Sequence, residues 1–419
     1  MALIVQKFGG TSVGNVERIQ NVAARALATQ AAGNDVVVIV SAMAGETNRL
    51  LKLAADVAPL PEAREMDALA ATGEQVTAAL TAIAVQSQGG KARSFLGHQM
   101  KILTDSAFTK ARIKAIDGGR VMEALKAGQI AVVAGFQGVD DDGNITTLGR
   151  GGSDTSAVAV AAAIGASACE IYTDVDGVYT TDPNICKTAR KIDRISYEEM
   201  LELASLGAKV LQIRSVEVAM KYGVPVHVRT SFSDAPGTWV VGEDSSFESV
   251  VVTGVAYDKG EARVMLVGVD DAPGVVAYVF GTLADENISV DMIIQNAPSD
   301  APSSRTSAGG PEHKTDVTFT VAKTDLPRVK LMMDAIAQKV AALGVRYDED
   351  IVKVSIVGLG MRSHAGVAAK MFKILADERI NIQAISTSEI KVSCIVATKY
   401  TELAVRALHD GFGLGNPPA

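Results

Sequence analysis

Cysteine is scarce in this chain of 419 residues. Cys169, Cys186 and Cys394 are the only three, and their spacing matches no zinc-binding sequence motif. An odd number of widely spaced cysteines does not predict the disulfide framework that small secreted domains use. We therefore expect a reducing compartment, the cytoplasm.

The chain is also poor in aromatic residues and in positive charge. Aromatic residues make up 5%, which is low for a surface that stacks nucleic-acid bases. The 48 acidic residues outnumber the 40 basic ones and give a formal net charge of -8. Because polyanions are bound mainly by clustered Lys and Arg, DNA, RNA and anionic membranes are not expected as partners.

Long apolar runs are missing as well. No run approaches the ~20 residues that cross a bilayer, and residues 1–8 show no basic region followed by a long apolar stretch. We therefore expect neither a membrane span nor a secretory signal.

What the sequence does contain is a globular composition, with 48% hydrophobic and 21% charged residues over a length that predicts two or three domains. In the first half, short β-branched segments alternate with longer alanine-rich ones. The expected strands are 3–8, 35–40, 130–136, 170–175 and 224–228, and the expected helices are 16–32, 67–86 and 155–164. This alternation predicts an α/β domain over residues 1–250, with a mainly parallel sheet covered by helices on both faces.

The second half contains an internal repeat, in which residues 274–288 align with residues 366–380. In each copy a strand leads through a turn into an amphipathic helix and a second strand, and a further strand and helix follow. This order predicts two βαββαβ, ferredoxin-like domains, at 251–343 and 344–419. Residues 297–311, rich in Pro, Ser, Ala and Gly, are expected to form a mobile surface loop.

The segment Lys7-Phe8-Gly9-Gly10 lies where the first expected strand meets the first expected helix. Glycines let backbone N–H groups approach an anion, a helix N-terminus adds positive potential, and lysine adds a full charge. The pattern favours phosphate binding, although the Walker A spacing is absent and a Gly-Gly pair after a strand is often only a turn.

Two further segments supply candidate ligands for a substrate at the same sheet edge, where open parallel sheets bind their ligands. Ser41 and Thr47 follow the second expected strand among small residues, although such hydroxyl groups also cap helices. Glu74 lies in an expected helix, where a carboxylate is usually solvated. An amino-acid substrate, however, needs an anionic partner for its ammonium group.

The segment Gly149-Arg150-Gly151-Gly152-Ser153-Asp154-Thr155 follows an Asp142-Gly143 hairpin signal and opens an expected helix. Glycines on both sides of Arg150 indicate a loop shaped around a ligand, with the guanidinium group available for a carboxylate. Asp154 is either part of this site or a simple helix N-cap.

Clustered carboxylates and hydroxyl groups follow another expected strand, from Thr173 to Pro183. Such a cluster can orient magnesium or a nucleotide, although Asp-Gly and Asp-Pro are also routine turn formers. Further on, Lys209 stands in an otherwise apolar helical segment, where it is either a ligand or a lysine that extends its amino group to solvent.

Together these segments resemble the aspartate kinase family within the wider amino-acid kinase fold. The matching strings, in the family's order, are K-F-G-G-T-S, V-S-A-M, G-R-G-G-S-D-T, Y-T-D-V-D-G-V-Y-T-T-D-P and G-A-K-V-L. The family also carries two tandem ACT domains, which match the internal repeat. The resemblance therefore covers the whole chain.

The resemblance implies roles for individual residues. Phosphate and ATP contacts fall on Lys7, Phe8, Gly9, Gly10, Ser41, Thr173, Asp174, Tyr179, Thr180, Asp182, Lys209 and Val210. Aspartate contacts fall on Thr47, Glu74, Arg150, Gly151 and Ser153, and Asp154 lies near the metal and, with Lys7, takes part in catalysis. The implied reaction is the Mg2+-dependent transfer of the ATP γ-phosphate to the side-chain carboxylate of L-aspartate, which gives 4-phospho-L-aspartate for lysine, threonine and methionine biosynthesis.

The chemistry of this reaction fits the residues that the motifs contain. A carboxylate acceptor with a pKa of about 3.9 is already ionised at neutral pH and needs no general base. The barrier lies in bringing two anions together, which calls for magnesium, lysine and backbone donors. The five histidines lie outside all the motifs, so we expect them to be structural or surface residues.

The repeats are expected to sense amino acids, by resemblance to ACT domains that bind lysine, threonine or both. Such effectors are expected where ACT domains pair, which predicts a homo-oligomer. The candidate effector contacts are Asp271, Gly274, Asn287, Gln295, Asn381, Ile382, Ser388 and Glu389. Any strand–helix turn contains similar polar residues, and Arg362 makes the second copy depart from the first.

Three alternatives remain. A kinase of the same fold could act on acetylglutamate, glutamate or carbamate, although the paired repeats and the G-R-G-G-S-D-T segment favour aspartate. A form fused to homoserine dehydrogenase is not expected, because no dinucleotide-binding pattern follows the second repeat. A non-catalytic amino-acid sensor would need no phosphate site and acceptor site together.

Overall fold

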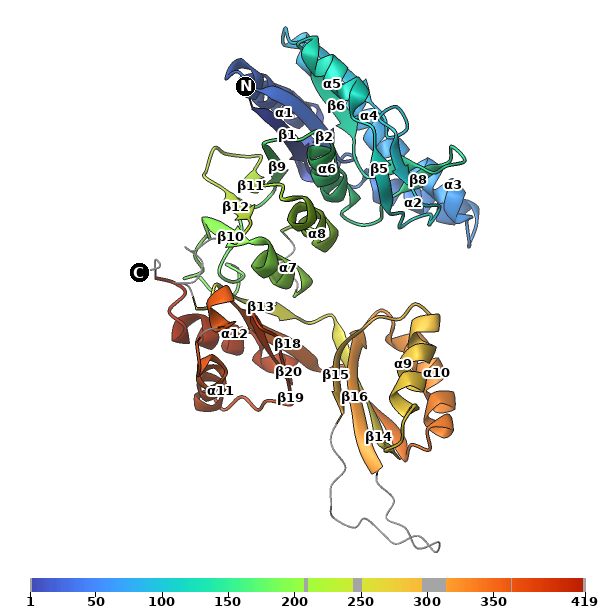
Figure 1. Ribbon diagram of the computed structural model, residues 1–419, viewed down its shortest axis with the longest axis vertical. Helices are drawn as coiled ribbons and strands as arrows, with labels where there is room; N and C mark the ends of the chain where they lie inside the picture. Colours follow the sequence, from blue (N-terminus) through green and yellow to red (C-terminus); the bar gives the residue numbers. More distant parts are fainter. Residues whose placement is uncertain (1, 207–209, 244–250, 296–313, 363, 417–419) are drawn as a thin grey trace, which may run out of the picture. The chain divides into compact units, whose positions relative to one another are not determined.

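The computed structural model describes residues 2–206, 210–243, 251–295, 314–362 and 364–416 (Figure 1). The predicted loop at 297–311 lies outside these residues. The chain divides into two compact units. The first comprises residues 1–183 and 189–251, and the second comprises residues 184–188 and 252–417, within the described ranges.

The first unit contains an eight-stranded sheet with the strand order β10-β12-β11-β9-β1-β2-β6-β3. The neighbouring strands run parallel except for β11 and β12. The strands are β1 (Leu3–Phe8), β2 (Asp35–Val40), β3 (Ala92–Phe95), β6 (Ile130–Ala134), β9 (Ala168–Thr173), β10 (Arg194–Ser196), β11 (Val226–Thr230) and β12 (Thr238–Val241). The predicted α/β class with a mainly parallel sheet is confirmed.

Helices cover both faces of this sheet. The helices of the first unit are α1 (Val16–Ala31), α2 (Glu46–Val57), α3 (Ala63–Ala70), α4 (Thr72–Ser87), α5 (Gly119–Lys126), α6 (Gly152–Ala163), α7 (Tyr197–Ser205) and α8 (Ile213–Tyr222), with a short 3-10 helix η1 (Gly10–Val13). Helices α1 and α4 pack on one face, over a core that includes Phe8, Val38 and Val132. Helices α5 and α6 pack against strands of the same sheet, and α8 packs on α6. Burial on both faces explains the nearly continuous Val and Ile in the central strands.

A small second sheet, in the order β5-β4-β7-β8, was not expected from the sequence apart from its hairpin. Its strands are β4 (Ile102–Thr104), β5 (Ile113–Ile116), β7 (Gln137–Val139) and β8 (Ile145–Thr147). Strands of three or four residues are too short to show a hydrophobic period. The turn between β7 and β8 contains Asp142-Gly143, as predicted, with Gly143 at a φ of 82°.

The predicted helix 67–86 is observed as two helices, α3 and α4, which meet at Ala71. Residues 63–87 together are long and apolar enough to cross a membrane by length and composition. However, 56% of the most apolar window in this stretch is buried inside the structure, as in a core helix.

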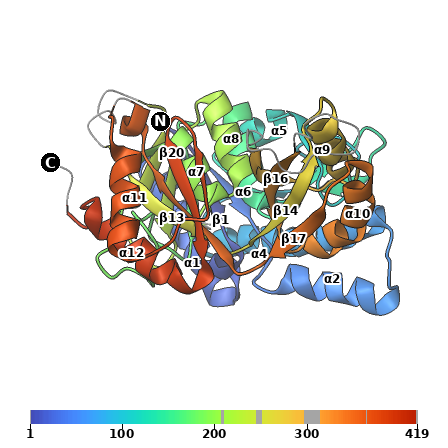
Figure 2. The same ribbon diagram turned by 90° about the horizontal axis from the view of Figure 1, so that it is seen from below.

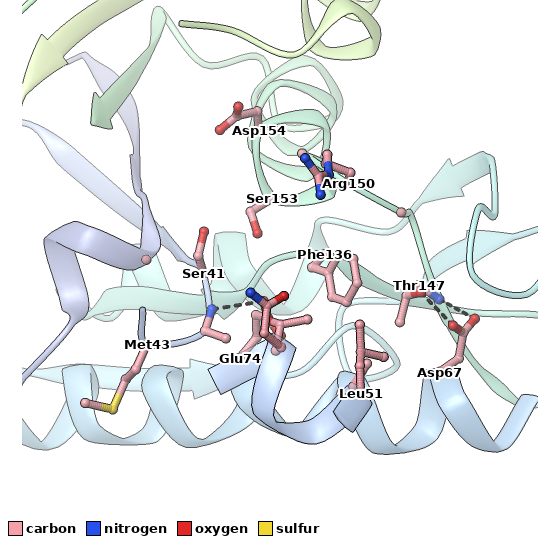
Figure 3. A pocket seen from close by; sticks show the side chains of 18 of the residues that line it. Ser41, Met43, Leu51, Asp67, Glu74, Phe136, Thr147, Arg150, Ser153 and Asp154 are labelled. Carbon is pink, nitrogen blue, oxygen red and sulfur yellow. Dashed lines mark hydrogen bonds between the residues drawn. The ribbon is translucent and has the colours of Figure 1, made fainter. Parts of the chain in front are cut away.

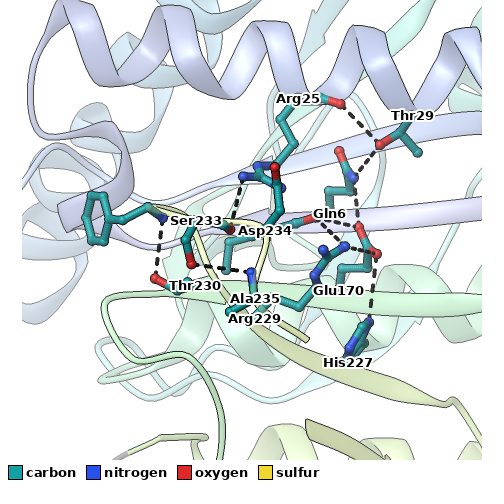
Figure 4. A network of polar contacts seen from close by, with 12 residues as sticks. Gln6, Arg25, Thr29, Glu170, His227, Arg229, Thr230, Ser233, Asp234 and Ala235 are labelled. Carbon is teal, nitrogen blue, oxygen red and sulfur yellow. Dashed lines mark hydrogen bonds and ion pairs between the residues drawn. The ribbon is translucent and has the colours of Figure 1, made fainter. Parts of the chain in front are cut away.

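A polar network fixes the register of the strands around β1 (Figure 4). Glu170 on β9 accepts hydrogen bonds from Gln6 on β1, at 2.8 Å, and from Arg229 on β11, at 3.2 Å. His227 lies 3.9 Å from Glu170, but burial lowers the pKa of this imidazole to about 4, so it is neutral at physiological pH. Successive side chains of a strand point to opposite faces of the sheet, so Lys7 lies on the face opposite to Gln6 and this network.

The second unit contains two four-stranded sheets. The first has the order β15-β16-β14-β17, and both of its helices pack on one face (Figure 2). Its elements are β14 (Glu261–Asp270), α9 (Val275–Asp285), β15 (Val290–Gln295), β16 (Lys314–Ala322), α10 (Leu326–Lys339) and β17 (Gly344–Asp348). This order is the predicted βαββαβ arrangement.

The second sheet has the order β13-β18-β20-β19. Its elements are β13 (Gly254–Asp258), β18 (Ile351–Val357), α11 (Val367–Asp377), β19 (Ala384–Thr387), β20 (Lys391–Ala397) and α12 (Thr401–Gly411), with 3-10 helices η3 (Leu359–Arg362) and η4 (Thr398–Tyr400). Strand β13 precedes the first repeat in the chain but pairs with β18 of the second. Strand β17, which follows residue 343, belongs to the first sheet. The predicted domain limits at residues 250 and 343 stay a prediction. The strand pairing assigns β13 to the sheet of the second repeat and β17 to the sheet of the first.

Candidate active site

The carboxyl ends of β1, β2 and β6 open into a pocket of about 580 Å³ (Figure 3). Its lining includes predicted residues from four separate segments, namely Lys7, Gly10, Ser41, Thr47, Glu74, Arg150, Gly151, Ser153 and Asp154. Parallel strands bring their carboxyl ends to one edge, which is where such sheets bind ligands. The segments that the sequence indicated are thus brought together.

Lys7 and Asp154 form an ion pair in this pocket. The Lys7 Nζ atom lies 2.6 Å from the Asp154 Oδ1 atom, and only 8% of Lys7 is exposed. Asp154 lies in the first turn of α6, whose N-cap is Gly151, so Asp154 is not the N-cap. The pair places the positively charged ammonium group of Lys7 beside a carboxylate oxygen of Asp154, a hard ligand, at the end of β1.

The glycine segment after β1 allows a close approach of backbone. A Cβ atom added to Gly10 would lie 3.0 Å from the carbonyl oxygen of Ala42. The N–H group of Gly9 donates to the carbonyl of Tyr172 on β9 at 3.1 Å. The chain then makes the short helix η1 before α1 begins at Val16, so a 3-10 turn rather than the first α-helix faces the pocket.

Glu74 is a buried carboxylate and not the solvated one that its place in a helix suggested. Only 3% of Glu74 is exposed, and its Oε1 atom accepts a hydrogen bond from the Ala42 N–H at 2.9 Å. Its Oε2 atom is buried and has no hydrogen-bond partner among the described residues. Burial raises the pKa of Glu74 from 4.5 to about 7. Gly73 permits this position, because a Cβ atom there would lie 2.8 Å from the Ala42 Cβ atom.

The Arg150 loop is held from behind by the segment that begins α8. Gly149 and Gly151 have φ angles of 77° and 71°, which favour glycine. The Gln212 side chain donates to the Arg150 carbonyl at 2.7 Å, and Arg214 donates to the Leu148 carbonyl at 2.6 Å. The Arg150 side chain itself is exposed at the pocket rim (Figure 3).

Several pocket residues were missed by sequence reasoning, among them Met43, Leu51, Asp67, Phe136 and Thr147. Asp67 is fully buried and accepts hydrogen bonds from the Thr147 N–H, at 2.8 Å, and the Thr147 hydroxyl, at 2.6 Å. It also accepts from the Thr109 N–H at 2.9 Å. Phe136 has a φ angle of 69°, unusual for a bulky residue, and the glycines on either side of Phe136-Gln137 were the only local signal.

The predicted nucleotide residues after β9 lie outside the lining of this pocket. Thr173 ends β9 beside the Gly9 turn, and its hydroxyl donates to Asp174 at 3.1 Å. The Tyr179 hydroxyl donates to Asp176 at 2.9 Å, and Thr180 is buried. Asp182 and Val210 are partly exposed, and Lys209 lies outside the described residues.

Comparison with known proteins identifies the chain. The model of the amino acid kinase family matches residues 2–230, and an ACT domain model matches residues 264–331 and 354–412. An aspartate kinase of Stutzerimonas stutzeri is 54% identical over 418 residues, which cover 100% of this chain and 98% of that protein. The chain belongs to the aspartate kinase family. An aspartokinase of Pseudomonas aeruginosa is likewise 54% identical, over 100% of this chain and 99% of its own length.

Solved structures of aspartate kinases share the fold. Aspartokinase III of E. coli in complex with aspartate and ADP, described as the R-state, superposes with a TM-score of 0.79 at 27% identity, covering 98% of this chain and 99% of that one. Its complex with lysine and aspartate, described as the T-state, gives a TM-score of 0.74 at 26% identity over the same shares. Aspartate kinase activity, a phosphotransfer, is thus the function of this chain.

The predicted effector residues all lie in the second unit. Gly274 and Gly366 are the N-caps of α9 and α11, with φ angles of 97° and 91°. Asp271, Asn287 and Gln295 of the first repeat are exposed, as are Asn381, Ser388 and Glu389 of the second, whereas Ile382 is partly exposed. Glu389 lies 3.5 Å from the Arg362 Nε atom, so an acidic residue of the second repeat faces a basic one.

Proposed function

We propose that this aspartate kinase transfers the γ-phosphoryl group of ATP to the side-chain carboxylate of L-aspartate and produces 4-phospho-L-aspartate. The observation that carries the proposal is the pairing, in one pocket, of the Lys7–Asp154 ion pair with the buried Glu74 carboxylate. The ion pair suits a phosphoryl group and its metal cation, and the buried carboxylate suits the ammonium group of an amino acid.

The acceptor site is specific for a free amino group. Glu74 offers a buried Oε2 atom that has no hydrogen-bond partner in the described part of the chain, and a substrate ammonium supplies one. Thr47 and Arg150 lie around the same pocket, where the arginine takes the α-carboxylate. Acetylglutamate carries a neutral amide in place of the ammonium and carbamate lacks a separate ammonium, so neither would bring a positive charge to the Glu74 carboxylate.

Lys7 is placed to neutralise the charge that develops on the transferred phosphoryl group. It lies on β1, a central strand, and its ammonium group is held by Asp154. The Gly9 N–H group is already bonded to the Tyr172 carbonyl, so the backbone donor that this turn offers to a phosphate is the N–H group of Gly10. ATP binds with its phosphates at this turn and its nucleoside toward Thr173, Asp174, Tyr179, Thr180, Asp182 and Val210, together with Ser41. The ATP contact expected of Lys209 falls outside the described residues.

The residues present fit a magnesium ion. Asp154 offers a carboxylate beside the phosphate turn, and magnesium in kinases is commonly held by one or two carboxylates together with substrate phosphates. When bound, the ion neutralises phosphate charge and so lets the anionic acceptor approach. Asp154 would hold it while remaining within reach of Lys7.

The transfer itself forms one bond and breaks one. An ionised side-chain carboxylate oxygen of aspartate attacks the γ-phosphorus in line, and the bond from that phosphorus to the β–γ bridging oxygen breaks. The electron pair leaves with ADP, which Lys7 and the glycine turn stabilise. No protein base is required, since the acceptor carboxylate is ionised at neutral pH.

We infer further that the second unit makes the enzyme subject to feedback inhibition by lysine, threonine or both. The support is the pair of ACT domain matches and the lysine complex of the E. coli relative. Assembly into a homo-oligomer through the ACT domains, and a cytoplasmic location, belong to the same proposal. The three cysteines are free thiols, as a reducing compartment allows.

Trapping the acyl phosphate tests the proposal. Full-length protein is incubated with ATP, Mg2+, L-aspartate and hydroxylamine, and hydroxamate is measured with and without lysine and threonine. We expect hydroxamate with aspartate, far less with glutamate or acetylglutamate, and a decrease when effectors are added. Lys52→Ala, on exposed α2, serves as a control for Lys7→Ala. Effector binding without any hydroxamate formation would contradict the kinase proposal and support a non-catalytic amino-acid sensor.

A further inference from the structure

Three potential metal ligands meet in the second unit, and none of them is among the described lining residues of the active-site pocket. Residues 184–188 belong to this unit, and Cys186 in that segment lies beside His409 and Asp410 at the end of α12. The Cys186 Sγ atom is 3.4 Å from the His409 Nδ1 atom. The Asp410 Oδ1 atom is 3.7 Å from the same nitrogen, and the three ligand atoms lie within 4.8 Å of one another.

We propose that Cys186, His409 and Asp410 bind a zinc-like divalent cation. In tetrahedral zinc sites the Zn–S and Zn–N bonds are about 2.3 and 2.0–2.1 Å, which places sulfur and nitrogen about 3.5 Å apart. The observed separation of 3.4 Å between Sγ and Nδ1 matches this value. Three protein ligands leave the fourth position to water, since Asp410 is exposed at the rim of the group.

The donor set selects the class of cation. A thiolate and an imidazole favour zinc or cobalt, whereas magnesium and calcium prefer an all-oxygen environment. The magnesium that accompanies ATP would therefore not compete for this group. The His409 side chain is fully buried, so its ring is held in place inside the protein, and a neutral imidazole is the form that metals bind.

The segment that carries Cys186 is held in place by the protein itself. Arg406 on α12 donates through its Nε atom to the Ile185 carbonyl at 2.8 Å. Thr188 also contacts the group, with its hydroxyl 3.1 Å from the Cys186 Sγ atom and 3.5 Å from the His409 Nδ1 atom. The ligands are thus preorganised by contacts that a cation is not needed to form. Metal-free protein is expected to fold, and substitutions of single ligands are expected to be tolerated.

Without a cation the same geometry is a hydrogen bond between thiol and imidazole, with an aspartate at its edge. The two states differ in the ionisation of the thiol, because a metal-bound cysteine is a thiolate. Spectroscopy of a cobalt complex detects that difference directly. It also distinguishes this group from the catalytic pocket, whose described lining residues include no cysteine.

The test uses the full-length protein, stripped of metal with a chelator, in buffer that contains excess Mg2+ to occupy oxygen-ligand sites. Titration with Co2+ is expected to give one equivalent of a near-ultraviolet thiolate-to-cobalt charge-transfer band and strong visible bands of a tetrahedral ion. Zn2+ is expected to displace it and to raise the melting temperature. Cys186→Ser should abolish the charge-transfer band.

The remaining variants separate this group from other thiols and carboxylates. Asp410→Asn should weaken Co2+ binding by roughly tenfold or more, given that even outer-shell partners of metal ligands contribute about 10–100-fold. Cys394→Ala, which removes a buried thiol of β20, and Asp377→Asn, which changes an exposed carboxylate at the end of α11, are matched controls and should leave the band unchanged. Absence of the band in the wild-type protein, or its persistence in Cys186→Ser, would overturn the proposal.

Discussion

The raised pKa of Glu74 predicts how aspartate use depends on pH. If Glu74 pairs with the substrate ammonium, only its ionised form binds well. Its pKa of about 7 in the free protein then places the loss of binding within the physiological range. We expect kcat/KM for aspartate to fall as the pH decreases below 7, and Glu74→Gln to lower kcat/KM while removing most of that dependence.

The magnitude follows from the fraction of Glu74 that is ionised. With a pKa of about 7, the ionised fraction is about nine tenths at pH 8 and about one tenth at pH 6. The value of kcat/KM for aspartate should therefore fall about tenfold between these two pH values, since this parameter reports the free enzyme. The substrate carboxylates, with pKa values near or below about 3.9, stay ionised over the whole interval.

The assay is the initial rate of hydroxamate formation at saturating ATP and limiting aspartate, measured at half-unit intervals from pH 5.5 to 8.5. Glu62→Gln, an exposed carboxylate at the start of α3, is the matched control and should keep the wild-type profile. A flat profile in the wild-type enzyme, or an unchanged profile in Glu74→Gln, would refute the assignment of Glu74 to the ammonium group.

Stability gives an independent check on the same residue. Folding raises the pKa of Glu74 from 4.5 to about 7. Below pH 4.5 the carboxyl is protonated in both the folded and the unfolded protein, and the shift has no effect on stability. As the pH rises from 4.5 through about 7, the shift lowers the free energy of unfolding. A shift of this size corresponds to about 3 kcal/mol. Glu74→Gln should therefore raise the free energy of unfolding at pH 8 by up to ~3 kcal/mol and change it little at pH 4.5, as urea denaturation would show.

Three further predictions follow from the rest of the molecule. Lys7→Ala should lower kcat by about 10²–10³-fold with an unchanged circular dichroism spectrum, as expected for loss of one charge-stabilising donor, and near-normal turnover would exclude the phosphate role. Asp67→Asn should raise the KM for aspartate and cost about 1–3 kcal/mol of stability, because one of its buried partners loses its acceptor; an unchanged KM would mean that the Thr147 region does not shape the site. A regulatory fragment beginning at residue 252 should melt cooperatively, whereas one beginning at residue 261 lacks β13 and should melt lower or aggregate.

Much of the catalytic fold could be predicted from the sequence because its central strands are strongly patterned. Strands β1 and β2 have the predicted limits, since β2 is a nearly continuous β-branched run and β1 ends at the Gly9-Gly10 turn. Strand β6 ends at Ala134 rather than at 136, because Gly135 and the positive φ of Phe136 turn the chain into the pocket. The small second sheet escaped prediction because its strands contain only three or four residues.

The candidate site was predictable where its residues lie at strand ends and not where they depend on distant partners. Lys7 and Arg150 stand in glycine-rich segments, which are visible locally. Asp67 has no such signal, because its partners Thr109 and Thr147 lie 42 and 80 residues away in the chain. The burial of Glu74 likewise depends on the fit of Gly73 against Ala42, which local sequence does not specify.

The organisation of the second unit shows what a repeat alignment omits. An alignment shows which elements each copy can form alone. In the first copy β17 follows the last helix and pairs with β14, but among the described residues no strand follows α12 to pair with β18 in the same way. All seven residues of β18 are buried, and a buried strand with an open edge is unstable, so β13 fills that place. The first repeat thereby becomes an insertion between β13 and β18. Lys353 on β18 joins the two sheets through ion pairs with Glu261 on β14 and Asp291 on β15. Because a buried charge is stable only with its partners in place, the two sheets depend on each other for stability.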